Sequence, residues 1–208
     1  MLSIKRVFGP KKIRPSSKKR SLHTIKYLTQ DELKRLLHVV GNKRDKALLL
    51  VAYRHGLRAS EVGLLKLEDI DTSRNRIRVS RVKNSQGGEY LMQNDEVKAV
   101  RAWLRERKDD NPYIFSSRCG NPVSRRNLDR MMKIYGRKAD LPADKRHFHV
   151  LRHSIAVHLL DAGADIRFVQ DWLGHTNINN TVVYAHLTNP TRDAQTKKLF
   201  ASPMIVRG

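Results

Sequence analysis

Near one end of the chain, imidazoles, a guanidinium and a phenol stand within a few dozen residues of one another. His149 and Arg152 are three residues apart, and His175 precedes Tyr184 by nine. A phenol can attack a phosphodiester and keep the bond energy in a phosphotyrosine, from which the strand can be resealed. Arginine forks suit the two non-bridging oxygens, and an acid must protonate the leaving hydroxyl. These residue types favour transesterification of a phosphodiester, with Tyr184 as nucleophile and His175 as a donor to the phosphate.

Further groups that this chemistry needs stand much earlier in the sequence. Arg58 follows the Gly56-Leu57 junction at the predicted start of a helix, where a cation is poorly placed unless an anion also binds. Glu61, one turn later, can orient this guanidinium, so that Arg58 and Arg152 would hold the two phosphate oxygens. Lys83 stands at the end of a predicted strand beside a hairpin tip, from which it can enter a cleft as the general acid.

Hydrophobic periodicity predicts that helices position most of these groups. Thr29 and Glu32 form a capping box at the start of the first helix. Helices are expected over 29–40, 42–55, after the caps Asn94 and Ser124, and over 148–162, 166–173 and 178–187. Alternating β-branched residues predict two strands, 76–82 and 89–92. The predicted fold class is therefore mainly α with a small antiparallel β-sheet.

The charge balance points to a polyanionic partner. The 208 residues carry a formal net charge of +22, and 39% of them are hydrophobic, enough for a sizeable core. Because cations placed on phosphates release condensed counterions, double-stranded DNA is the leading partner. No apolar run approaches the ~20 residues needed to span a bilayer, so no membrane association is expected. The single cysteine, Cys119, excludes an intrachain disulfide, and we expect a bacterial cytoplasmic or nucleoid location.

Two basic segments are candidates for DNA contact. Residues 1–26 carry many lysines and arginines and no acid, which indicates a flexible basic arm; a solvated leader or a localisation signal explains the arm equally well. The helix after Ser124 is also strongly basic. The candidate DNA-binding residues are Lys11, Lys12, Lys18, Lys19, Arg20, Arg125, Arg126 and Arg130.

Other chemistries fit the sequence less well. His147, His149 and His153 resemble a zinc cluster in composition, but their spacing includes no cysteine and no partnered carboxylate completes an open site. No Gly-x-Ser-x-Gly elbow and no Walker loop is present. We therefore expect neither a metal nor another cofactor.

Four blocks, taken together and in order, resemble the tyrosine recombinases, also called the phage integrase family. They are the run from His55 to Val62, the hairpin with Lys83, the His149-x-x-Arg152-His153 block, and Leu173-Gly174-His175 followed by Tyr184. The resemblance covers residues 27–188 and implies a catalytic domain of the DNA breaking-rejoining type. It implies a 3′-phosphotyrosyl intermediate, with Tyr184 as nucleophile. The active site that it implies consists of Arg58, Lys83, His149, Arg152, His175 and Tyr184, supported by Glu61 and His153.

The resemblance also implies assembly. Recombinases of this family exchange strands through a four-way junction, so a homo-oligomer is expected, a tetramer in the synaptic complex, with an accessory DNA-bending protein as a further partner. Residues 189–208 would form a tail that contacts a neighbouring protomer. Residues 1–26 are too few for the helical core-binding domain of most members, as in the short fimbrial phase-switch recombinases. A non-catalytic DNA-binding accessory or truncated remnant, and a type IB topoisomerase-like activity, remain alternatives.

Overall fold

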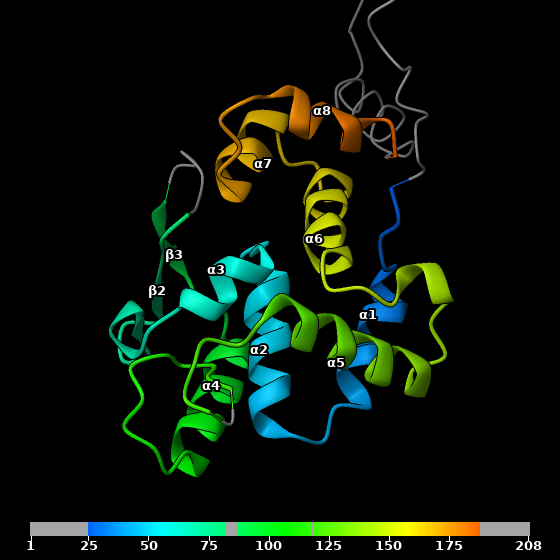
Figure 1. Cartoon of the computed structure of the whole chain (residues 1–208). Helices are drawn as coiled ribbons and strands as arrows, with labels where there is room; N and C mark the ends of the chain where they lie inside the picture. Colours follow the sequence, from blue (N-terminus) through cyan, green and yellow to red (C-terminus); the bar gives the residue numbers. More distant parts are fainter. Residues whose placement is uncertain (1–24, 82–86, 118, 188–208) are drawn as a thin grey trace, which may run out of the picture.

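The computed structural model describes residues 25–81, 87–117 and 119–187, and helices account for most of them (Figure 1). The α-helices are α1 (Gln30–His38), α2 (Lys43–Arg54), α3 (Ala59–Leu64), α4 (Asn94–Glu106), α5 (Arg125–Lys138), α6 (Val150–Asp161), α7 (Ile166–Leu173) and α8 (Asn179–Ala185). The other elements are the 3-10 helices η1 (Leu67–Asp69) and η2 (Ala143–Lys145) and the strands β1 (Ile70–Asp71), β2 (Arg76–Val79) and β3 (Gly88–Leu91). The mainly helical fold class with a small antiparallel sheet is confirmed.

Side-chain caps fix where several helices begin. Thr29 Oγ1 accepts from the amide of Glu32 at 3.2 Å, and the Glu32 carboxylate accepts from the amide of Thr29 at 2.8 Å, as the capping box predicts. The prediction that Asn94 caps α4 is wrong by one residue. Gln93 is the N-cap instead, because the carboxylate of Glu96 reaches back to its amide.

The sheet is antiparallel in the order β1-β2-β3, and its buried face packs on the helices. Ile77 pairs with Tyr90, and Ile77 and Val79 are buried. The predicted strand 76–82 ends early, at Val79, and the Arg81 side chain beyond it is fully buried. The two-residue β1 was not predicted, since Ile70–Asp71 is too short to show an alternating period.

α2 lies at the centre of the core. Its residues 47–53 are all buried, and the helix packs against both α4 and α6. α6 is buried on nearly every side, so it shows almost no amphipathic pattern. A helix of this kind belongs to the interior. As a result, the helix that carries Arg152 and His153 is itself a core element.

The segment before α1 is fastened to α6. Leu28 is fully buried, its amide donates to Ser154 Oγ at 2.8 Å, and its carbonyl lies 2.8 Å from His158 Nε2. His158 Nδ1 lies 2.8 Å from Tyr53 Oη. Because a carbonyl only accepts, Nε2 must donate to it, and Nδ1 of a neutral His158 then accepts from the phenol. This chain of bonds ties three segments that are distant in sequence.

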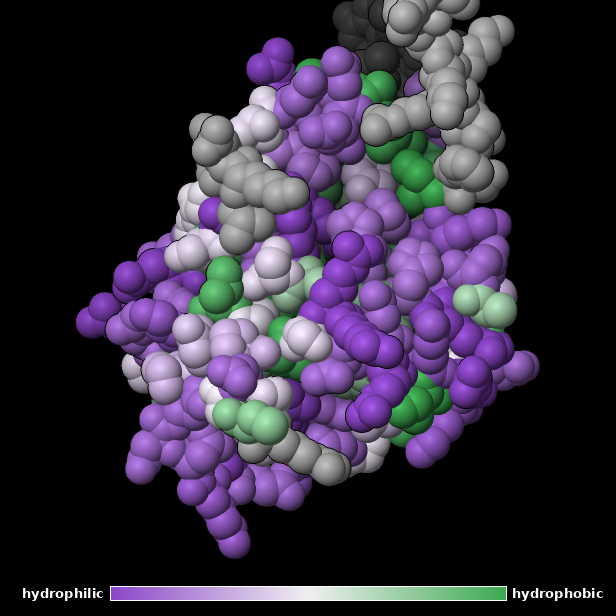
Figure 2. Space-filling model, viewed as in Figure 1, coloured by the Kyte–Doolittle hydropathy of each residue, from purple (hydrophilic) through white to green (hydrophobic). Residues whose placement is uncertain are grey.

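One face of the molecule is predominantly polar. In the view of Figure 2 the visible face is mostly hydrophilic, with only small apolar areas. α5 begins after Ser124, which caps it as predicted, and its Arg125, Arg126 and Arg130 are all exposed. None of the helices that the structure describes is long and apolar enough to cross a membrane.

Candidate active site

A sharp turn after α2 positions Arg58, the first cation of the site. Gly56 has φ +56°, in the left-handed region, and a Cβ built on it would lie 2.5 Å from Leu173 Cδ2. Glycine allows both this backbone conformation and the close approach of the end of α7. The turn leaves Arg58 at the N-cap of α3, the position that the sequence predicted.

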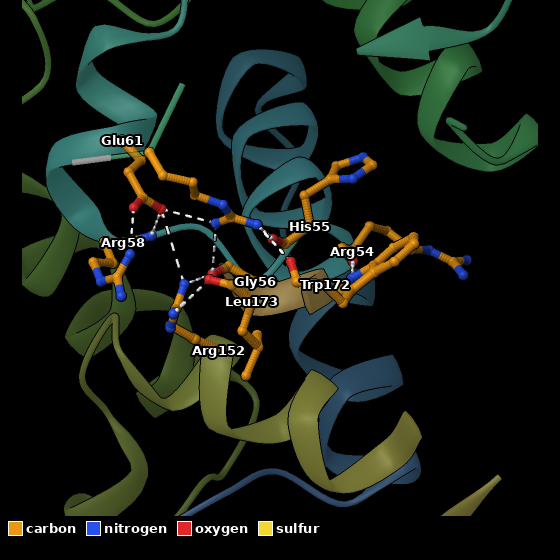
Figure 3. A network of polar contacts seen from close by, with 9 residues as sticks. Arg54, His55, Gly56, Arg58, Glu61, Arg152, Trp172 and Leu173 are labelled. Carbon is orange, nitrogen blue, oxygen red and sulfur yellow. Dashed lines mark hydrogen bonds and ion pairs between the residues drawn. The ribbon is translucent and has the colours of Figure 1, made fainter. Parts of the chain in front are cut away.

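The carboxylate of Glu61 joins cations from three parts of the chain (Figure 3). Its Oε1 accepts from Arg58 Nη1 at 2.6 Å, and its Oε2 accepts from the Arg58 amide at 2.8 Å. Oε2 also accepts from Arg81 Nη1 at 2.9 Å and lies 3.9 Å from Arg152 Nη1. Burial opposes ionisation of Glu61, but the Arg58 amide and the Arg81 charge outweigh it, and the pKa is lowered. Glu61 therefore orients Arg58, as predicted, and meets two more guanidinium groups.

Arg152 is held by main-chain oxygens. The residue is 1% exposed, its Nη1 donates to the Gly56 carbonyl at 2.5 Å, and its Nη2 donates to the Leu173 carbonyl at 2.8 Å. Burial, and next the charge of Arg58, lower the pKa of Arg152 to about 9, so it remains a cation at neutral pH. With three guanidinium groups around one carboxylate, this cluster carries an excess of positive charge and favours an anionic ligand.

Three imidazoles lie near these cations. The rings of His149 and His153 meet edge to face with centroids 4.5 Å apart, and His175 Nδ1 lies 2.9 Å from Thr181 Oγ1. Desolvation lowers the pKa of His153 and of His175 to about 3, assisted by the charge of His149 on the first and of Arg152 on the second. His149 is more open to solvent, and desolvation followed by Arg152 lowers its pKa to about 4. All three rings are therefore neutral at pH 7.

Tyr184 lies on α8, against α6. It is 3% exposed, and its Oη lies 2.8 Å from Nδ1 of His153. Burial raises the pKa of the Tyr184 phenol, while the charges of Arg152 and Arg58 oppose the rise. The phenol is therefore protonated at neutral pH and needs a proton acceptor before it can act as a nucleophile.

The structure thus brings together residues from both halves of the sequence. Arg58, Glu61 and Arg152 share one cluster, and His153 contacts Tyr184. Lys83 lies outside the described residues. So do residues 1–24 of the predicted basic arm, with Lys11, Lys12, Lys18, Lys19 and Arg20, and the whole predicted tail, 189–208. Within the described ranges, no three His, Cys, Asp or Glu side chains are grouped so that they could hold a metal ion.

The basic helix α5 reaches toward the same region. The charge of Arg125 contributes to the lowered pKa of His149, after the larger effects of desolvation and Arg152. Arg125, Arg126 and Arg130 are exposed and border a common surface depression.

A sequence model of the family described as "Phage integrase family" matches residues 26–190. The chain belongs to the phage integrase family. The tyrosine recombinase XerA of Pyrococcus horikoshii is 36% identical over 166 residues, which are 78% of this chain and 57% of XerA. The type 1 fimbriae regulatory protein FimE of Escherichia coli (strain K12) is 38% identical over 168 residues, 76% of this chain and 84% of FimE. The chain thus spans little more than half of XerA and most of FimE.

A solved structure supports the fold of this family member. XerH, crystallised on its palindromic difH substrate as a post-cleavage complex, aligns with a TM-score of 0.75 and 21% identity. The alignment covers 92% of this chain and 58% of XerH. The tyrosine recombinase catalytic-domain fold expected from the sequence motifs is therefore confirmed.

One residue of the cluster was not predicted. Arg81 was interpreted as part of an alternating strand, and its side chain is instead fully buried against Glu61. The sequence signal for a buried Arg81 is weak. Charge falls on the even positions 76 and 78 of the predicted strand, and Ser80-Arg81 departs from this alternation. The same segment contains several arginines, so the departure does not show which of them is buried. Which of them faces inward depends on where β2 ends, and β2 ends at Val79.

Proposed function

We propose that this member of the phage integrase family is a site-specific DNA recombinase that cuts strands with Tyr184 and rejoins them to new partners. The observation that carries the proposal is the convergence of a cation cluster and a phenol. Arg58 is bonded to Glu61, Arg152 lies 3.9 Å from the same carboxylate, and the Tyr184 hydroxyl contacts a neutral imidazole, His153. This combination supplies what transesterification of a phosphodiester needs.

In the proposed reaction the phosphate binds to Arg58 and Arg152. The Tyr184 hydroxyl gives its proton to Nδ1 of His153 as its oxygen attacks phosphorus. The bond from phosphorus to the 5′ oxygen breaks, and Lys83 supplies a proton to that oxygen. The products are a 3′-phosphotyrosyl bond and a free 5′-hydroxyl. Attack by the 5′-hydroxyl of another strand reverses these steps, so no energy-rich cofactor is consumed.

His149 and His175 complete the proposed phosphate site. Both lie close enough to Arg152 for its charge to lower their pKa. The negative charge of a bound phosphate would raise the pKa of both rings. Each ring can then donate a hydrogen bond to a phosphate oxygen. In this scheme Glu61 and His153 support the reaction, the first by orienting Arg58 and the second by accepting the phenolic proton.

The proposed substrate is double-stranded DNA, bound in part by α5. The exposed side chains of Arg125, Arg126 and Arg130 would contact phosphates, as would the basic arm. XerH, which shares the fold, was crystallised on DNA. We further propose a homo-tetramer in the synaptic complex, a tail contact between protomers, an accessory DNA-bending protein, and action in the bacterial cytoplasm or nucleoid.

The test is a covalent trapping assay on nicked duplexes, in which the short cleaved strand diffuses away. Incubation with a library of candidate sites should give a protein–DNA adduct that survives denaturation. Tyr184→Phe should abolish the adduct, because phenylalanine lacks the nucleophile. Tyr113→Phe is the matched control and should leave the amount of adduct unchanged. Tyr113 is a half-buried tyrosine beside α3 and η1.

Three results would contradict the proposal in different ways. If the native chain formed no adduct on any site, the remaining function would be DNA binding without catalysis. An adduct that persists in Tyr184→Phe would assign the nucleophile to another residue. Relaxation of supercoiled plasmid without preference for a sequence would indicate a topoisomerase-like activity.

A further inference from the structure

Arg81 is a buried cation whose two terminal nitrogens donate to protein oxygens, while its Nε has no hydrogen-bond partner among the described residues. Its side chain is fully buried just beyond the end of β2. Nη1 donates to Glu61 Oε2 at 2.9 Å, and Nη2 donates to the carbonyls of His55 at 2.9 Å and Trp172 at 2.6 Å. The guanidinium also lies 5.7 Å from the centre of the Tyr90 ring. One side chain therefore connects the end of α2, α3, the end of α7 and the sheet.

Arg81 and Arg152 donate to neighbouring carbonyl oxygens of the same two chain segments. Arg152 donates to the carbonyls of residues 56 and 173, and Arg81 donates to those of residues 55 and 172. Nη1 of Arg81 also donates to the Gly56 carbonyl at 3.4 Å, so the two arginines share this oxygen. Residues 55 and 56 follow α2, and residues 172 and 173 end α7. The C-terminal end of a helix carries partial negative charge, so both ends stabilise the cations. The pair of guanidiniums clamps the two helix ends against each other.

Arg58 and Arg81 differ in the solvent exposure of their side chains. The side chain of Arg58 is 27% exposed, and only its Nη1 and its backbone amide are engaged by Glu61. The side chain of Arg81 has no exposed surface, and both of its terminal nitrogens are engaged by protein oxygens. A DNA phosphate can therefore reach Arg58, whereas it would have to displace internal bonds to reach Arg81.

We propose that Arg81 is a positioning residue, which holds Glu61 and the end of α7 so that Arg58, Arg152 and His175 face one phosphate. The proposal rests on the function proposed above. Through Glu61, Arg81 acts on the orientation of Arg58. Through the Trp172 carbonyl, it acts on the turn that leads to His175. Loss of Arg81 should leave the phosphate-binding cations present but misaligned.

Stability alone is a weak reason for such an arrangement. A buried ion pair contributes little net free energy compared with apolar side chains of similar volume. Glu61 also keeps its bonds to Arg58 when Arg81 is removed, so its carboxylate is not left without a partner. We therefore expect Arg81→Met and Arg81→Lys to fold, while both variants lose the guanidinium fork that holds the Glu61 carboxylate and the backbone carbonyls together.

The experiment compares Arg81→Met and Arg81→Lys with the native chain and with Arg78→Met. Arg78 is the matched control, since it stands on β2 with its side chain exposed. Four quantities are measured: thermal unfolding, DNA affinity, the salt dependence of affinity, and the single-turnover rate of covalent adduct formation. Arg58→Met serves as the reference for a residue that contacts phosphate.

The expected result is a loss in rate without a loss in phosphate contact. Misplacement of reacting groups by ~1 Å can cost about 100-fold in rate, and we expect this order of loss for Arg81→Met. Arg81→Lys should lose about 10-fold, because lysine restores the charge but not the planar fork. The slope of log affinity against log salt should stay native in both variants, whereas Arg58→Met should reduce it by about 1. Arg78→Met should leave the rate at the native value.

Each other outcome overturns the proposal. Native rates in both Arg81 variants would show that the clamp is dispensable. A salt slope reduced as in Arg58→Met would place Arg81 on the phosphate. Failure of both variants to fold would assign Arg81 to the stability of the domain. Because the native chain is assayed in parallel, absence of any native adduct would count against the proposed function and not against the role of Arg81.

Discussion

Nδ1 of His153 lies 2.8 Å from the hydroxyl oxygen of Tyr184, so the candidate nucleophile is already hydrogen-bonded to an imidazole before DNA is present. The ring comes from α6 and the phenol from α8, two helices that pack together. Since the phenol is protonated at neutral pH and the imidazole is neutral, the pair is in the ionisation state from which proton transfer can start.

Replacing His153 by Phe should slow covalent adduct formation by about 100-fold, because the phenol then loses its proton acceptor. The rate is measured in single turnover on a nicked duplex. His147→Phe is the matched control: His147 lies in the same segment and makes no comparable contact with Tyr184 among the bonds of the described residues. If the two variants had equal rates, His153 would have no part in the chemistry.

DNA affinity should rise as the pH falls from 7 to 5. In the free protein the pKa of His175 is lowered to about 3, so the ring carries no proton in this range. A bound phosphate favours the charged form and raises the pKa, so the complex takes up protons that the free protein does not hold. Proton uptake on binding means tighter binding at lower pH. Fluorescence anisotropy across this range gives the dependence, and His175→Asn should flatten it; an equal slope in that variant would exclude His175 as its source.

Thr181 should matter to the reaction through His175. Its hydroxyl lies 2.9 Å from His175 Nδ1 and is fully buried, so it restricts the ring to one orientation. Thr181→Val keeps the shape but removes the bond, and adduct formation should fall about 10-fold while DNA affinity changes little. Thr181→Ser keeps the hydroxyl and should retain most of the rate. Equal loss in the serine and valine variants would indicate a packing effect.

Gly56→Ala should destabilise the fold by about 1–2 kcal/mol, the cost of placing an L-residue with a side chain in the left-handed region. The added methyl also meets Leu173 Cδ2 at 2.5 Å, so the end of α7 must shift, and adduct formation should fall as well. Gly41→Ala is the control, since a Cβ there has no heavy atom within 4 Å. Chemical denaturation measures both free energies. A Gly56→Ala variant as stable as the control would contradict the strain argument.

Much of the fold could be predicted because its signals are local. The capping box at Thr29, the apolar run of α2 and the range of α7 from Ile166 to Leu173 all follow from residues within one or two turns. The end of β2 and the burial of Arg81 depend on packing between segments that are distant in sequence, and these were not predicted.

The candidate site was predictable for a different reason. The types and spacing of Arg58, Arg152, His175 and Tyr184 carry the chemistry, and the resemblance to a family placed them in one centre. The sequence does not reveal what holds them, because Arg152 is positioned by two carbonyl oxygens. Any residue can offer a carbonyl, so such contacts leave no trace in side-chain patterns.

The anchoring of Leu28 has a consequence for engineering. Both polar groups of its backbone are bonded to α6, at Ser154 and His158, within two turns of Arg152. A DNA-recognition module fused ahead of Ile25 would therefore leave the domain from a point with a defined position relative to the scissile phosphate. The reach of the fusion would then be set by the length and stiffness of the linker, and the cleavage position on a chosen target could be shifted by changing the linker.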